Sequence, residues 1–439
     1  AVDHQVFISQ LQAIESLPYK AVKIGLIASL QQVLTIRDFL DKAAVPSVLD
    51  TVFSSSSGET FLNDELVQSV RQHLLPRTTL LTPNIHEAAK LVGSQINTTA
   101  AIEAAADSIL SMGSNAVLIK GGHFPWNNNQ PIQDYFTDGK KSFWLASEPV
   151  STAYCRGSGC ALASAIASAL AINYSLYDAL VIGKMAISQG LRHAYGVESE
   201  YGPVSIRQFP NSQCDLPVLS HTPLSRLDTK PFADCQPPLL ALYPVVNRAG
   251  WIKILADAGV TTVQLRVKDL QGETLSKEIE QAVALAKIHR IRLFINDHWR
   301  LAIIHRAYGV HLGQEDLDTA DTEQIYRAGL RLGISTHCHY EVARAHGYRP
   351  SYMACGPVFH TTTKDMPWIP HGIDGLNYWQ KLLSYPLVAI GGINGERFAS
   401  VAATGVDGIA MITAITEAEN PGSQARDFVS QFQAHSTHH

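Results

Sequence analysis

The residues best suited to chemistry alternate along the stretch VQLRVKD, Val263 to Asp269. Gln264, Arg266 and Lys268 occupy every second position of this stretch. In an extended strand they share one face, so an amide and two cations point the same way. That set suits a polyanion such as a diphosphate. An edge strand with a solvated face would show the same local pattern, so the neighbouring strand ends must decide between the two.

Polar groups also follow most of the later strand-like segments. Asp297 and Asp316 come shortly after two of them. One aspartate at a strand end is commonly a helix N-cap, but two that face an arginine and lysines favour a metal site. Two carboxylates, with water and a diphosphate completing the shell, suit Mg²⁺. The other polar or small groups at these ends are Asn296, Ser335, Thr361, Thr363, Lys364, Gly392 and Thr413.

These groups need a scaffold that brings strand ends together, and the sequence after residue 239 predicts one. Apolar runs bounded by turn residues alternate with helical segments, which predicts eight β/α units in about 200 residues, the lower size limit of a TIM (β/α)8 barrel. An open doubly wound sheet is the alternative. The predicted strands are 239–246, 261–267, 291–297, 309–313, 331–336, 352–358, 386–392 and 406–413.

A barrel mouth of this composition would hold two phosphorylated ligands at once. The cations and Mg²⁺ would bind a diphosphate, and the ends of strands seven and eight, at Gly392 and Thr413, would bind a monophosphate. An enzyme that stabilises a departing diphosphate by charge releases a carbon electrophile. A nucleophile carrying the monophosphate would then attack it. An isomerase of amino-acid synthesis is disfavoured, because the predicted strand ends carry no second carboxylate pair for acid/base work.

The first 205 residues predict a separate α/β domain with a parallel sheet. Asp-Gly between two strand-like runs predicts a hairpin over 134–145. The proline-rich stretch 206–238 predicts an extended, partly ordered linker. The expected organisation is therefore domain 1–205, linker and barrel domain 239–439. The predicted strands of the first domain are 21–27, 46–52, 79–84 and 116–122.

The chemistry of the first domain is expected at CRGSGCALASAIASAL, 155–170. Gly157 and Gly159 bracket Ser158, and an alanine-rich helix follows at once. Small residues let backbone N–H groups approach an anion at the positive end of the new helix. Cys160 falls in the first turn of that helix, where we expect a lowered thiol pKa. A tight loop with a small buried cysteine is the alternative.

The bulk composition excludes several classes of protein. Apolar residues are 46% and charged residues 17% of the chain, typical of a compact globular protein. A net charge of −5 argues against a nucleic-acid surface. No run of 18 apolar residues predicts a membrane span. The six cysteines form no CxxC pair or disulfide-framework spacing, which favours a cytoplasmic location.

Three motifs of the first domain occur in the order TPNIHEAA, VLIKGGH and RGSGCALASAIA. Together they resemble the ribokinase-like fold, and most of all the hydroxymethylpyrimidine and hydroxymethylpyrimidine-phosphate kinases. The resemblance implies ATP as co-substrate, with Asn84 and Glu87 near its phosphates and magnesium and Lys120 near the nucleotide. It implies that the loop from Gly157 is the anion hole for the transferred phosphoryl group and that Cys160 is the catalytic base.

The chain departs from these kinases at its front. The family opens with a strand, a GGAG turn and a glutamine that hold the pyrimidine, and none of them is present after Ala1. We expect the native protein to carry a preceding segment. The alternative is that this half is a non-catalytic dimerisation module beside an active barrel.

Seven motifs of the second half occur in the order QLRVKD, INDHWRLA, GVHLGQEDL, LGISTHC, GPVFHTTTK, VAIGGIN and DGIAMITAI. Together they resemble thiamine-phosphate synthase over 239–433. The resemblance implies that Asp297 and Asp316 hold Mg²⁺. It implies a pyrimidine diphosphate site of Gln264, Leu265, Arg266, Val267, Lys268, Asn296, Ser335 and Lys364. It implies a thiazole phosphate site of Thr361, Thr362, Thr363, Gly392, Ile412 and Thr413.

The two resemblances together imply a fused enzyme of thiamine biosynthesis. The synthase reaction joins hydroxymethylpyrimidine diphosphate to a carboxylated thiazole phosphate and releases diphosphate and carbon dioxide. The product of the kinase is the substrate of the synthase. The expected partners are these small molecules and ATP, with no nucleic acid or membrane, and a homodimer could form through the kinase half.

Overall fold

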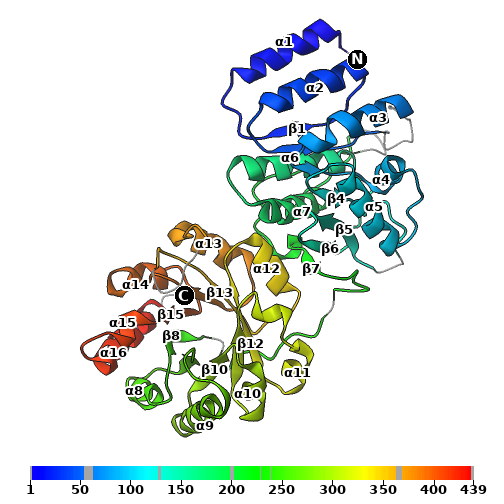
Figure 1. Cartoon of the computed structure of the whole chain (residues 1–439). Helices are drawn as coiled ribbons and strands as arrows, with labels where there is room; N and C mark the ends of the chain where they lie inside the picture. The colour runs from blue at the N-terminus through cyan, green and yellow to red at the C-terminus, as the bar shows by residue number, and fades with distance from the viewer. Residues whose placement is uncertain are drawn as a thin grey trace. The chain divides into compact units, whose positions relative to one another are not determined.

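The structure is a computed structural model that divides the chain into two compact units (Figure 1). It describes residues 2–53, 63–126, 130–197, 202–227, 229–237, 239–361 and 368–436. The units comprise Ala1–Pro210 with Cys214–Asp228, and Asn211–Gln213 with Thr229–His439. Across the described ranges, every helix is too short or too polar to cross a bilayer.

The first unit is built on a seven-stranded sheet with its strands in sequence order. The first four strands are parallel and the last three antiparallel. They are β1 (Val22–Ile24), β2 (Ser47–Leu49), β3 (Leu80–Leu81), β4 (Val117–Ile119), β5 (Ile132–Thr137), β6 (Ser142–Ser147) and β7 (Val218–Ser220). The predicted parallel sheet and the hairpin of β5 and β6 are confirmed.

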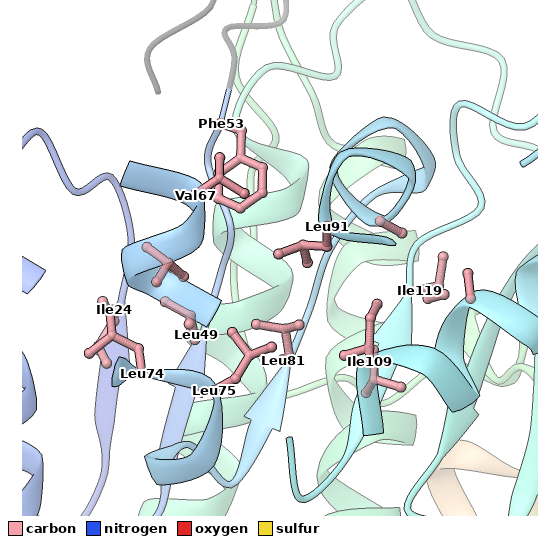
Figure 2. Close-up of a cluster of buried hydrophobic side chains, with 14 of the residues drawn as sticks. Ile24, Leu49, Phe53, Val67, Leu74, Leu75, Leu81, Leu91, Ile109 and Ile119 are labelled. Carbon is pink, nitrogen blue, oxygen red and sulfur yellow. The ribbon is translucent and has the colours of Figure 1, made fainter. Parts of the chain in front are cut away.

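Helices pack around this sheet because its inner strands are apolar on both faces. Figure 2 shows side chains of β1 to β4 meeting those of α3, α4 and α5 in one apolar cluster. Helix α6 contacts β1 and β2 and packs along α7. The helices are α1 (His4–Glu15), α2 (Leu30–Lys42), α3 (Asp64–His73), α4 (Ile85–Val92), α5 (Thr99–Ser111), α6 (Ser158–Ala171) and α7 (Leu176–Arg192).

The stretch 206–238 differs from the expected extended linker. Its residues Val218–Ser220 form β7, the last strand of the first sheet. Leu224 exchanges two hydrogen bonds with the side chain of Gln133 on β5. Further on, Ala233 accepts a hydrogen bond from Ser351 of the second unit. Both units therefore take up parts of this stretch, because its short apolar runs find partners between the prolines.

The second unit is a closed barrel of eight parallel strands, as predicted, and the open-sheet alternative is wrong. The strands are β8 (Ala241–Val246), β9 (Thr262–Leu265), β10 (Arg292–Asn296), β11 (Gly309–Leu312), β12 (Arg331–Thr336), β13 (Tyr352–Cys355), β14 (Leu387–Ile390) and β15 (Gly408–Met411). Each is a nearly continuous buried run, and the ring closes where β15 pairs with β8. This closure gathers the carboxyl ends of all eight strands at one mouth.

The barrel is surrounded by helices that follow its strands. They are α8 (Trp251–Asp257), α9 (Gly272–His289), α10 (Trp299–Ile304), α11 (Thr322–Arg327), α12 (His339–His346), α13 (Gly372–Leu382), α14 (Gly395–Ala402), α15 (Thr413–Thr416) and α16 (Pro421–Ser436). Inside the ring, Tyr243, Phe294 and Tyr352 form an aromatic cluster. This cluster makes the barrel a packed core, so ligands must bind at its mouth.

Candidate active sites

The basic stretch that follows β9 lies at the barrel mouth. Gln264 and Leu265 are the last residues of β9 and are buried, while Arg266 beyond them is half-buried and donates its backbone N–H to Val246. Lys268 is exposed and forms an ion pair with Asp297, which follows β10. Lys268 is therefore in direct contact with the residue that follows the neighbouring strand β10.

The two predicted metal ligands lie together. Asp297 adopts a left-handed backbone conformation with φ +63° and donates its N–H to the carbonyl of His311. Asp316 begins a short 3-10 helix, and its Oδ2 accepts a hydrogen bond of 3.0 Å from the backbone of Gly313. The carboxyl groups of Asp297 and Asp316 are close enough for each to shift the pKa of the other. A backbone held in a sparsely populated region beside a paired carboxyl is typical of a functional site.

The charges of this pair fit a divalent cation. Burial and the adjacent Asp297 carboxylate raise the pKa of Asp316. Burial also opposes ionisation of Asp297, but Lys268 outweighs it and lowers the pKa of that carboxyl. Within the described ranges no cluster of three or more His, Cys, Asp or Glu side chains could hold a metal. Two carboxylates that leave the remaining positions to water and phosphate oxygens are the donor set of Mg²⁺.

A buried histidine connects further residues of the predicted diphosphate site. His311 lies within β11, and its Nε2 is 2.8 Å from the hydroxyl of Ser335 on β12. Its Nδ1 is 2.7 Å from the hydroxyl of Tyr352. Burial lowers the pKa of His311 to about 4, so the ring is neutral at neutral pH. The sequence analysis did not assign His311 to the site, although its position within an apolar strand was a usable signal.

The Gly-Gly turn after β14 forms the other side of the mouth. Gly391 and Gly392 have φ values of +98° and +66°. A Cβ atom on Gly392 would lie 2.4 Å from the carbonyl oxygen of His360, so the position requires glycine. Arg397, which the sequence analysis missed, donates to the carbonyl of Gly392 at 2.7 Å and lies over the ring of Phe359.

The remaining predicted residues of the barrel fall into two groups. Asn296 is the buried last residue of β10, Val267 is buried beyond β9, Ile412 precedes α15, and Thr413 is the first residue of that helix. Thr361 is half-buried at the end of the described segment. Three predicted residues lie outside the described residues, namely Thr362, Thr363 and Lys364. The expected convergence of Lys364 with Arg266 and the aspartates therefore stays a prediction.

The candidate site of the first unit is centred on Asp50, which is only 2% exposed. Lys120 donates to its Oδ1 at 2.8 Å, and Lys23 lies 3.5 Å from its Oδ2. A Cβ atom on Gly159 would lie 3.1 Å from the ammonium of Lys120. Gly157, the N-cap of α6, has φ +78°. The glycine loop, the lysine after β4 and the carboxylate after β2 are thus adjacent.

Cys160 corrects an expectation. It lies in the first turn of α6 as predicted, but its pKa is raised instead of lowered. Loss of solvent around the thiol and the nearby negative charge of Asp50 both favour the protonated form. These effects outweigh the positive helix end and the ammonium groups of Lys23 and Lys120. The resting thiol is therefore protonated and lies close to a buried carboxylate.

Asn84 and Glu87 form a capping box at the start of α4. The side chain of Asn84 accepts the N–H of Glu87 at 2.9 Å, and Glu87 Oε2 accepts the N–H of Asn84 at 2.7 Å. The hydroxyl of Thr51 also donates to Glu87 at 3.2 Å. Burial raises the pKa of Glu87. Both residues lie beside Lys120, which pairs with Asn84 through a β-bridge. Their structural role is to cap the start of α4.

Comparison with known proteins gives one family for each unit. Residues 1–205 match the family described as phosphomethylpyrimidine kinase, and residues 242–415 match thiamine monophosphate synthase. The thiamine-phosphate synthase of Serratia proteamaculans is 55% identical over 43% of this chain and 90% of that protein. That of Photorhabdus laumondii is 52% identical over 45% of this chain and 91% of that protein.

Among solved structures, a phosphomethylpyrimidine kinase from Clostridium difficile is 29% identical to this chain. It covers 43% of this chain and 76% of its own, with a TM-score of 0.37. In general the kinase family uses ATP, both families use Mg²⁺, and both act on small molecules. The chain belongs to the thiamine-phosphate synthase family through its barrel, and a phosphomethylpyrimidine kinase domain precedes that barrel.

Proposed function

We propose that this chain makes thiamine monophosphate from a pyrimidine that its first unit phosphorylates with ATP. The barrel would join hydroxymethylpyrimidine diphosphate to a carboxylated thiazole phosphate and release diphosphate and carbon dioxide. The observation that carries the proposal is the adjacent pair of Asp297 and Asp316, with Lys268 in contact with Asp297, at the mouth of a closed barrel. We also propose a cytoplasmic location and homodimers formed through the first unit.

The basic residues of the barrel mouth would bind the diphosphate. Arg266 and Lys268 supply fixed positive charge, and Asp297 and Asp316 would hold Mg²⁺, which lowers the charge on a leaving diphosphate when it is bound. The chain contributes orientation and charge rather than a nucleophile. Ionisation leaves a pyrimidine-methyl cation, which the electrons of the pyrimidine ring stabilise. The C–O bond to diphosphate breaks and the thiazole nitrogen supplies the pair for the new C–N bond.

The second substrate would bind across the mouth. Gly392 presents backbone without a side chain, and Thr413 offers a hydroxyl at the start of α15. We assign the thiazole phosphate to this region, together with Ile412 and the loop Thr361–Thr363. Lys364 would contact the diphosphate from the same loop. The two phosphorylated groups would then lie on opposite sides of the reacting carbon and nitrogen.

The first unit would transfer a phosphoryl group from ATP to the pyrimidine. The loop from Gly157 to Gly159 would receive that group, and Lys120 would contact the nucleotide. Cys160 would act as base by passing its proton to Asp50, whose charge acts on the thiol. This arrangement favours a catalytic unit over the alternative of a dimerisation module, which gives no reason for a thiol to share a buried carboxylate with two lysines.

One assay tests both halves. The whole chain is supplied with pyrimidine diphosphate, thiazole phosphate and Mg²⁺, and thiamine phosphate is measured. Formation of thiamine phosphate that stops on chelation of Mg²⁺ is expected, and its absence would contradict the synthase assignment. The assay is then repeated with pyrimidine monophosphate and ATP. Product that disappears in Cys160→Ala, while the first assay is unchanged, supports the kinase. ATP consumption equal in both proteins would favour the dimerisation module.

A further inference from the structure

A chain of buried hydrogen bonds crosses the interior of the barrel. Ser335 Oγ lies 2.8 Å from Nε2 of His311, and Nδ1 of His311 lies 2.7 Å from the Tyr352 hydroxyl. The Tyr352 hydroxyl lies 2.8 Å from that of Tyr243. Ser335, at one end of the chain, belongs to the proposed diphosphate site, whereas His311, Tyr352 and Tyr243 have no assigned role.

The burial of this chain restricts how its hydrogens are arranged. Tyr243 is 1%, Tyr352 0% and His311 5% exposed. Buried polar groups need partners inside the protein, because each unsatisfied one costs about 1–3 kcal/mol. A neutral histidine has one donor and one acceptor nitrogen, and a phenol has one hydrogen to donate. Once one hydrogen in such a chain is fixed, the others follow.

The ligand fixes the direction of the chain. Phosphate oxygens of a diphosphate carry no hydrogen to donate, so Ser335 can bind one only by donating its own hydroxyl hydrogen. Ser335 Oγ must then accept a hydrogen from Nε2 of His311, which leaves Nδ1 of His311 to accept from the Tyr352 hydroxyl.

This arrangement determines what Ser335 can offer a ligand. If Nδ1 of His311 accepts from Tyr352, Nε2 carries the ring hydrogen and donates it to Ser335 Oγ. The hydroxyl hydrogen of Ser335 is then available for an anion. In the other tautomer, Ser335 would donate to His311 and present only lone pairs to a diphosphate, which would repel it. A donor aimed at developing negative charge is the interaction that accelerates such a reaction.

We propose that His311 is a positioning residue that, held as its Nε2–H tautomer by Tyr352, keeps the Ser335 hydroxyl free to donate to the departing diphosphate. This inference rests on the proposed synthase function. Neither His311 nor Tyr352 needs to touch the substrate for this role. Their effect should therefore appear in kcat more than in KM, and only when Ser335 is present.

Two matched substitutions test the direction of the chain. Tyr352→Phe removes the donor to Nδ1, and we expect kcat to fall about tenfold, the value of one hydrogen bond of about 1.4 kcal/mol. Tyr243→Phe removes the same atom from the neighbouring ring but leaves Tyr352 able to donate to His311. We expect a much smaller loss from it. Equal losses in the two variants would overturn the proposal, because they would indicate a role in packing alone.

A double-mutant cycle tests whether His311 and Tyr352 act through Ser335. In a Ser335→Ala background, Tyr352→Phe should cause no further loss of kcat. An additive tenfold loss would contradict the proposal. His311→Gln retains a donor long enough to reach Ser335, whereas His311→Asn does not. We expect the Gln variant to keep more activity than the Asn variant, and the reverse order would count against the relay.

The tautomer can also be measured without turnover. In protein labelled with ¹⁵N at histidine, the two ring nitrogens of His311 are assigned by comparison with His311→Gln. We expect the shift of a bare nitrogen at Nδ1 and of a protonated one at Nε2. The reverse assignment would overturn the inference even if the barrel makes thiamine phosphate. Failure of the wild-type chain to turn over would instead count against the proposed function.

Discussion

Asp297 and Asp316 follow different strands of the barrel, yet their carboxyl groups are close enough for the charge of Asp297, together with burial, to raise the pKa of Asp316. Two ionised carboxyl groups side by side repel each other unless a proton or a cation compensates their charge. Lys268 neutralises only Asp297. The metal-free barrel therefore contains a destabilising pair of charges that Mg²⁺ would relieve.

Asp316→Asn should lower the activity of the synthase and raise the stability of the metal-free protein. We expect turnover of the synthase to fall about 100-fold, equivalent to about 3 kcal/mol of transition-state stabilisation. The melting temperature of the metal-free protein should rise at mildly alkaline pH, because the raised pKa of Asp316 means that its ionisation destabilises the fold. That destabilisation is absent below its ordinary pKa and develops as pH increases through the raised value.

Calorimetric titration with Mg²⁺ provides the control for this prediction. Affinity for Mg²⁺ should fall on acidification as Asp316 takes up a proton, and it should do so at a higher pH than for a carboxyl with an ordinary pKa. Glu315→Gln alters an exposed neighbouring carboxylate and should leave both turnover and affinity close to wild type. Loss of Mg²⁺ affinity in Glu315→Gln but not in Asp316→Asn would show that the metal ligands are assigned wrongly.

Gly392→Ala should weaken binding of the thiazole phosphate. The new Cβ would collide with the carbonyl oxygens of Phe359 and His360 at 2.7 and 2.4 Å, and φ +66° disfavours any side chain. We expect KM for the thiazole phosphate to rise at least about tenfold, while KM for the pyrimidine diphosphate changes less. Steady-state kinetics with each substrate varied in turn measures both constants.

Gly395→Ala is the matched control for that substitution. A Cβ at Gly395 would meet nothing within 4 Å. The substitution lies in the first turn of α14, close to the same turn, and it changes the chain by the same methyl group. Equal effects of the two alanines would mean that the turn after β14 does not hold the phosphate.

The order of elements could be predicted because the barrel strands are continuous apolar runs separated by turn residues. Runs such as LLALYPVV are buried on both faces, and a strand buried in this way is recognised in the sequence as a continuous apolar run. The two-residue strand at Leu80–Leu81 was also detectable because buried residues flank it. The strand at Val218–Ser220 was not, since three residues between prolines carry no period.

The chemistry of single groups was harder to predict, because it depends on residues far away in the chain. The pKa of Cys160 is raised largely by loss of solvent and by Asp50, which comes from the end of β2. Local sequence shows only the helix end, which acts in the opposite direction. The role of His311 likewise requires contacts to β12 and β13 that only the closed barrel creates.

Asp50→Asn should make Cys160 more reactive. The substitution removes the negative charge that raises the pKa of the thiol and leaves Lys23 and Lys120 beside it. The pH at which half of the thiol is ionised should therefore decrease. The rate of alkylation as a function of pH measures it in protein whose other exposed cysteines, Cys155 and Cys214, are replaced by serine.

Kinase activity should also fall in Asp50→Asn, because Cys160 can act as a base only if Asp50 accepts its proton. Wild-type protein should show slow alkylation at neutral pH, and the Asp50→Asn variant faster alkylation with less phosphoryl transfer. Faster alkylation together with unchanged phosphoryl transfer would show that Asp50 does not accept the proton. Lys120→Met, which removes a cation beside the same carboxylate, should move the thiol pKa in the opposite direction.

Lys184→Met should destabilise the first unit and loosen its nucleotide loop. Lys184 on α7 and Asp134 on β5 form a buried ion pair at 2.7 Å, with side chains 9% and 6% exposed. Removing one partner leaves an uncompensated buried charge, which costs about 3–5 kcal/mol. Asp134 also accepts the N–H of Gly121 at 2.8 Å, so a displaced carboxylate releases the loop after β4.

Hydrogen exchange followed by mass spectrometry can assign this loss to one unit. Amides of β5 and α7 should exchange faster in Lys184→Met, while those of the barrel strands stay protected, because the two units are separate compact bodies. KM for ATP should increase as well. Lys277→Met breaks an exposed ion pair with Glu273 and should change little. Faster exchange throughout the barrel in Lys184→Met would contradict an independent first unit, and unchanged exchange in α7 would contradict the importance of the buried pair.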